Sequence, residues 1–70
     1  YLKAEKFLKR AVELMPNDPI VNDHYGDILW KLDRRIQARY FWSSVLGMDD
    51  VTKDLIEKIN IKLVDGLKSL

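Results

Sequence analysis

The sequence predicts an all-α protein in which four helices form antiparallel helix hairpins. Apolar residues recur every three to four positions along four separate stretches. The stretches are separated by short segments that contain proline, glycine or paired aspartates. The chain compared with itself at an offset of 34 residues also repeats its apolar pattern. Because each connection is only a few residues long, sequential helices are expected to pack antiparallel.

The first two expected helices are separated by a segment with two prolines. Apolar spacing predicts a helix from Leu2 to Met15, and Pro16 ends it because proline has no amide hydrogen to donate. Asp18 followed by Pro19 has the pattern of an N-cap and a first helical residue. A second helix is therefore expected to begin near Pro19 and to end near Asp33.

The last two expected helices follow the same logic. A third helix is expected to begin near Arg35 and to stop around Gly47, which is predicted to adopt the left-handed conformation common at helix C-termini. Asp49 and Asp50 then resemble a capping pair that favours the positive end of a fourth helix, and its apolar spacing continues through Leu67.

Length and composition limit the classes of protein that fit. Seventy residues allow a single domain, 1–70, and the near-neutral formal charge of +1 does not favour nucleic acid or an anionic membrane. The chain has no cysteine, no signal-peptide pattern and no apolar run long enough for a membrane helix. It opens on Tyr1, so we expect a piece of a longer protein, and its compartment is not encoded.

The comparison at 34 residues pairs the first helix with the third, and less closely the second with the fourth. In the first pair Ala4, Phe7, Leu8 and Ala11 fall on Ala38, Phe41, Trp42 and Val45. In the second pair Tyr25, Gly26 and Leu29 fall on Ile59, Asn60 and Leu63. Alternating helices with this period are typical of a helical repeat.

The pattern resembles the tetratricopeptide repeat (TPR) family. The positions of the family pattern fall on Asn22, Tyr25, Gly26, Leu29, Ala38, Trp42 and Asp50. Three residues depart from it: Asn22 stands in place of an aromatic residue, Asp33 in place of a turn glycine, and Asp50 in place of a proline. The resemblance implies a second helix of a partial repeat at 1–15, one full repeat at 19–48, and at 51–68 a capping helix or, as the alternative, a truncated repeat. The implied packing positions are Ala4, Leu8, Ala11, Tyr25, Gly26, Leu29, Ala38, Trp42 and Val45.

Gly26 stands inside an expected helix, where glycine costs about 1 kcal/mol relative to alanine. Its small size, together with that of Ala38, is expected to let two helices approach closely. The alternative explanation is a site where a ligand approaches the backbone.

The sequence does not predict an enzyme. His24 is the single histidine, and no converging partners for a general base or a metal ligand are apparent. Asp23 and Asp27 share a helical face, which is more typical of a solvated face than of a metal site. Acidic residues are interleaved with the basic ones at Lys3, Lys6, Lys9, Arg10, Arg34, Arg35 and Arg39, so we do not expect nucleic acid as a partner. We also expect no membrane, metal or cofactor as a partner.

The function expected from the resemblance is peptide or protein binding on a concave helical face. That face maps onto Ile20, Asp23, Asp27, Trp30 and Lys31, which also share one stripe by their spacing. The two aspartates favour a basic or neutral peptide, and Trp30 either supplies an apolar contact or packs against a neighbouring helix. The alternative function is a structural C-terminal cap or a self-association segment, so a homo-oligomer stays open.

Overall fold

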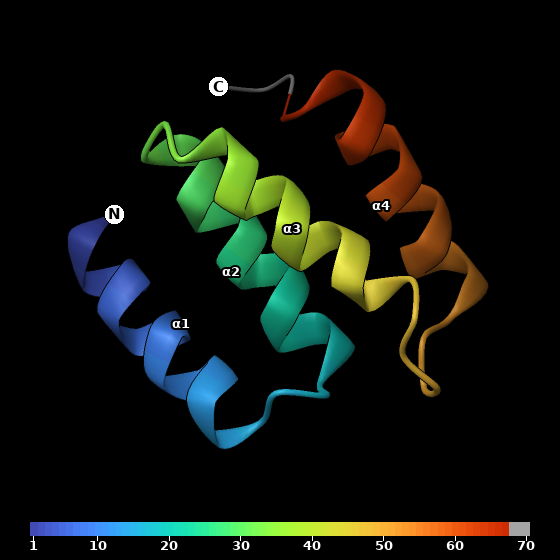
Figure 1. The fold of residues 1–70 in the computed structure, drawn as a ribbon, viewed down its shortest axis with the longest axis horizontal. Helices are drawn as coiled ribbons and strands as arrows, with labels where there is room; N and C mark the ends of the chain where they lie inside the picture. The colour runs from blue at the N-terminus through green and yellow to red at the C-terminus, as the bar shows by residue number, and fades with distance from the viewer. Residues whose placement is uncertain (68–70) are drawn as a thin grey trace.

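The computed structural model describes residues 1–67 and confirms the all-α fold class. Within these residues there are four α-helices and no β-strand: α1 (Leu2–Leu14), α2 (Pro19–Lys31), α3 (Arg35–Val45) and α4 (Lys53–Asp65). Successive helices run in opposite directions, and α2 and α3 lie between α1 and α4 (Figure 1). The helix hairpins expected from the short connections are therefore present.

Side-chain caps fix the start of two helices. The carboxylate of Asp18 accepts hydrogen bonds from the backbone N–H groups of Ile20 and Val21, as predicted for α2. In α4 the cap is Thr52, whose hydroxyl accepts from the N–H of Leu55. The prediction that Asp49 and Asp50 cap this helix is therefore wrong, because they lie in the turn that precedes Thr52.

The left-handed turn residue also differs from the prediction. Gly47 does not have a positive φ, because α3 ends in consecutive i to i−3 hydrogen bonds, including Gly47 N–H to the Ser44 carbonyl. Asp33 has φ 62° and lies between α2 and α3. The N–H groups of Asp33 and Arg34 bond to the carbonyls of Trp30 and Leu29, which is the Schellman arrangement.

The fourth helix is shorter than the expected 51–68. Gly66 has φ 68°, and its N–H bonds to the Lys62 carbonyl, which closes the helix after Asp65. Leu67 lies beyond the helix but packs against the core, and residue 68 falls outside the described residues.

The core lies between α2, α3 and α4. Its largest fully buried side chains are Trp42, Leu29, Ile59 and Val45. By contrast, α1 contains no buried residue, and its Leu8 and Val12 are only partly buried where they pack against this core. The helix pair at the centre therefore holds the fold, and the two outer helices cover it from opposite sides.

Candidate functional site

The outward face of α2 carries most of the residues that the sequence assigned to a binding face. Ile20 is 53% exposed, and His24 and Lys31 are exposed too. The side chain of Asp27 is 28% exposed, whereas that of Asp23 is only 9% exposed. The predicted stripe is thus divided, because α4 covers one of its edges.

A lysine of α4 joins the two aspartates of α2. Lys62 Nζ lies 2.7 Å from Asp23 Oδ1 and 2.9 Å from Asp27 Oδ1. Asp27 Oδ1 also accepts a hydrogen bond from Trp42 Nε1 at 3.1 Å. The same Trp42 nitrogen lies 3.3 Å from the carbonyl oxygen of Asp23. This polar cluster, made of Asp23, Asp27, Trp42 and Lys62, connects three helices at the edge of the core.

The cluster sets the protonation of its lysine. Burial alone lowers the pKa of Lys62, but its hydrogen bonds to Asp23 and Asp27 outweigh burial and raise the pKa above the ordinary lysine value. The ammonium is therefore charged at neutral pH. Two carboxylates against one ammonium leave a net charge of −1 on the cluster, and Asp27 presents it to solvent.

Trp30 packs inward rather than standing free. Its ring stacks on Trp42 with centroids 5.5 Å apart, and the Arg35 guanidinium lies 4.5 Å from its centroid. A Cβ added at Gly66 would stand 2.2 Å from Trp30 Cζ2, so the end of α4 also touches the ring. Of the two interpretations that the sequence left open, the structure shows the contact with a neighbouring helix.

Lys31 turns toward α1. Its Nζ lies 5.4 Å from the centroid of the Tyr1 ring, a cation–π geometry. On the outward face of α2 this leaves Ile20 and His24 exposed, with the partly exposed carboxylate of Asp27 beside them.

The nine packing positions fall into two groups. Tyr25, Gly26, Leu29, Ala38, Trp42 and Val45 are buried, whereas Ala4, Leu8 and Ala11 on α1 are only half-buried. A Cβ added at Gly26 would stand 2.5 Å from Trp42 Cδ1 and 3.2 Å from the carbonyl oxygen of Ala38. Gly26 and Ala38 thus lie at a close approach of α2 and α3, and the space that Gly26 leaves is filled by the Trp42 ring.

Sequence reasoning missed Lys62, Arg35 and the structural part played by Asn22. The Asn22 side-chain amide donates to the carbonyls of Pro16 and Asp18 at 3.1 and 2.8 Å. These bonds tie the α1–α2 connection to α2, and Asn22 is 3% exposed. The available signal in the sequence was an asparagine at the position where the repeat pattern has an aromatic residue.

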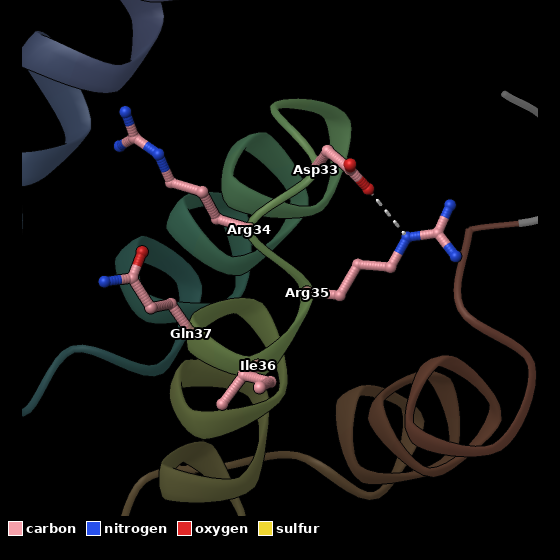
Figure 2. A pocket seen from close by; sticks show the side chains of 5 residues that line it. All are labelled: Asp33, Arg34, Arg35, Ile36 and Gln37. Atoms are coloured by element: carbon pink, nitrogen blue, oxygen red, sulfur yellow. Dashed lines mark ion pairs between the residues drawn. The ribbon is translucent and has the colours of Figure 1, made fainter.

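An open pocket with a volume of about 400 Å³ lies at the α2–α3 turn. Figure 2 shows its lining, with Arg34 and Arg35 pointing to opposite sides and an ion pair between Asp33 and Arg35. Arg34 also pairs with Glu5 of α1. All five lining residues are exposed, which differs from the enclosed sites that small molecules favour.

Two further features are absent from residues 1–67. No group of three or more histidine, cysteine, aspartate or glutamate side chains is placed to hold a metal ion. None of the helices described there combines the length and apolarity needed to cross a bilayer. Comparisons with protein-family models, curated proteins and solved structures gave no match.

Proposed function

We propose that this chain is a non-catalytic helical-repeat module of the tetratricopeptide type, which binds a peptide or protein segment on the outward face of α2. The observation that carries the proposal is the exposed strip formed by Ile20, His24 and Asp27. An apolar side chain stands there beside a carboxylate that belongs to a cluster of net negative charge. Such a strip suits a peptide with an apolar residue next to a lysine or arginine.

Support for the repeat type comes from the helix bounds. Pro19–Lys31 moved by 34 residues gives Lys53–Asp65, the bounds of α4. The cap bond from Val21 N–H to Asp18 has its counterpart 34 residues later, from Leu55 N–H to Thr52. The close approach at Gly26 and Ala38 agrees with the small residues that the repeat pattern requires.

The carboxylate of Asp27 still has capacity for a cation. The bonds from Lys62 and Trp42 both go to Oδ1, and Oδ2 has no partner among the described residues. A carboxylate offers about four acceptor sites, so Oδ2 is free for a ligand cation. The contact of the Lys62 ammonium with Oδ1 supports this proposal, because it is the kind of contact that a ligand lysine would make.

The test is a titration followed by amide NMR shifts with two short synthetic peptides that share their apolar residues, one with lysines and the other with glutamates. We expect the lysine peptide to shift the amides around Ile20, His24 and Asp27. Asp27→Asn keeps an acceptor for Trp42 Nε1 but removes the charge, and it should weaken that binding about two- to fivefold. Asp49→Asn, an exposed acid in the α3–α4 turn, is the matched control.

The proposal fails if the glutamate peptide binds as tightly as the lysine peptide. It also fails if Asp27→Asn and Asp49→Asn change the affinity equally, or if the shifts map to another face.

A further inference from the structure

A pocket opens where the C-terminal ends of α1 and α3 meet the start of α2. The α1–α2 and α3–α4 connections lie at the same end of the molecule, because successive helices run in opposite directions (Figure 1). The pocket between them has a volume of about 360 Å³. It shares no residue with the outward strip of α2, so its ligand would be recognised by side chains other than those proposed for the peptide.

The walls of this pocket are mainly apolar. Val12 comes from α1, Tyr40 and Phe41 come from α3, and Met48 comes from the α3–α4 connection. Val12, Phe41 and Met48 also pack against the core, which holds the walls in place. None of the residues that line the pocket is charged. A charged ligand would lose its water there without gaining an ionic partner, so the pocket favours a neutral ligand.

Asn22 contributes an acceptor that has no donor. Its side-chain NH₂ group donates to the carbonyls of Pro16 and Asp18. These two acceptors fix the orientation of the amide, because the amide oxygen cannot donate to them. The oxygen, Asn22 Oδ1, accepts no hydrogen bond within residues 1–67.

The position of Asn22 directs this free oxygen to the pocket. The residue is only 3% exposed, and the open space that it borders is the pocket. In the described part of the chain, no side-chain nitrogen or oxygen that is shut off from the surface lacks a partner, so Oδ1 is not sealed in the core. An acceptor with apolar surroundings forms a stronger hydrogen bond than one in water, so the pocket favours a ligand with a donor.

We propose that this pocket binds a small, neutral aromatic molecule that carries one N–H or O–H group. The ring packs against Phe41 and Met48, because aromatic rings and thioethers both form favourable contacts with aromatic rings. Its donor bonds to Asn22 Oδ1. A cavity of about 150 Å³ holds benzene, so the volume here is sufficient for two fused rings such as those of indole.

The first test is a titration with indole, followed by the amide NMR shifts of the unmodified chain. N-methylindole has the same rings without the N–H, and skatole carries its extra methyl group on a ring carbon and keeps the N–H. We expect indole and skatole to give saturable shifts of the amides of Val12, Asn22 and Met48. N-methylindole should bind about three- to tenfold more weakly, because it leaves Asn22 Oδ1 without a donor.

A matched pair of variants locates the binding. Ser44 lines the pocket and is half-buried, whereas its neighbour Ser43 is exposed and does not line it. Ser44→Leu fills the pocket and should lower the affinity for indole about tenfold. Ser43→Leu adds the same side chain outside the pocket and should leave the affinity unchanged. Circular dichroism checks that both variants keep their helices, and the comparison of indole with N-methylindole needs no variant.

Equal affinities for indole and N-methylindole overturn the inference, because Asn22 Oδ1 then takes no part in binding. Shifts that do not saturate also overturn it, since Oδ1 then bonds to water only, and so do shifts that map away from the pocket or survive Ser44→Leu. None of these results affects the proposed peptide site, which the lysine peptide tests on another side of α2.

Discussion

Replacing Gly26 with alanine tests how closely α2 and α3 approach. The added methyl carbon would stand 2.5 Å from both Cδ1 and Nε1 of Trp42, far inside van der Waals contact. The Trp42 side chain has no exposed surface, and its Nε1 is held by the hydrogen bond to Asp27. The ring cannot move without breaking that bond or disturbing the core around it.

The opposing terms decide the sign of the effect. In a helix interior, replacing glycine with alanine stabilises the helix by about 1 kcal/mol. Overpacking a close-packed core costs about 1–3 kcal/mol, and displacing the Trp42 N–H costs about 1 kcal/mol more. The free energy of unfolding should therefore fall by about 1–3 kcal/mol. In a domain of this size each kcal/mol lowers the melting temperature by about 4–8 °C.

Thermal unfolding followed by circular dichroism measures this change. Gly47→Ala is the matched control, because its new Cβ meets only the Ser44 carbonyl at 3.8 Å, an ordinary contact. In a Trp42→Leu background the methyl group has more room, so Gly26→Ala should cost less there than in the natural chain. A melting temperature that Gly26→Ala leaves unchanged or raises would refute the reasoning.

Four further changes follow from the same structure. Asn22→Ala removes two hydrogen bonds to backbone carbonyls of the α1–α2 connection and should lower the free energy of unfolding, measured in urea, by about 1–3 kcal/mol. Asp33→Gly relieves the strain of a positive φ, and glycine also adds entropy to the unfolded chain. The net gain in the free energy of unfolding should be about 0.5 kcal/mol, which raises the melting temperature by a few degrees. Lys62→Met leaves two neighbouring carboxylates without their cation and should destabilise by about 1–3 kcal/mol, whereas Lys53→Met at an exposed site of the same helix should be near neutral. The pKa of Lys62 is raised by its carboxylate partners, and that of Tyr25 is raised by burial and by Glu5, so both groups hold their protons more tightly when folded. The stability they add is complete below about pH 10 and is lost as the pH rises beyond it. Urea unfolding should therefore show a decrease in stability above about pH 10 that is smaller in Lys62→Met.

The helices themselves were predictable because apolar periodicity reports burial directly. Their ends were less so, because an end depends on which backbone groups find partners. Gly47 has the residue type expected of a left-handed position, yet i to i−3 bonds close α3 without one. Asp33 adopts that conformation instead, since the chain must reverse at once between α2 and α3.

The candidate site was predictable only where a single helix determines it. Helical spacing correctly placed Ile20 and Asp27 on one face of α2. It did not reveal that Asp23 is covered, because its partner Lys62 lies 39 residues away in the sequence. A lysine in an amphipathic helix has the same pattern whether it meets solvent or a carboxylate, so the pairing depends on tertiary packing.

Lys62 also decides how a ligand cation meets the α2 face. Asp23 is 7% exposed, so a ligand reaches its carboxylate only if α4 moves away. The side chain of Asp27 is 28% exposed while α4 stays in place, and a cation at its Oδ2 neutralises the negative charge that Lys62 leaves uncompensated. A peptide that contacts Asp27 alone therefore binds the intact fold, whereas one that takes both carboxylates must displace Lys62 and lose the hydrogen bonds holding α4. The first mode costs less free energy because it breaks none of these bonds, so the proposed peptide site requires one cation and leaves the helix arrangement unchanged.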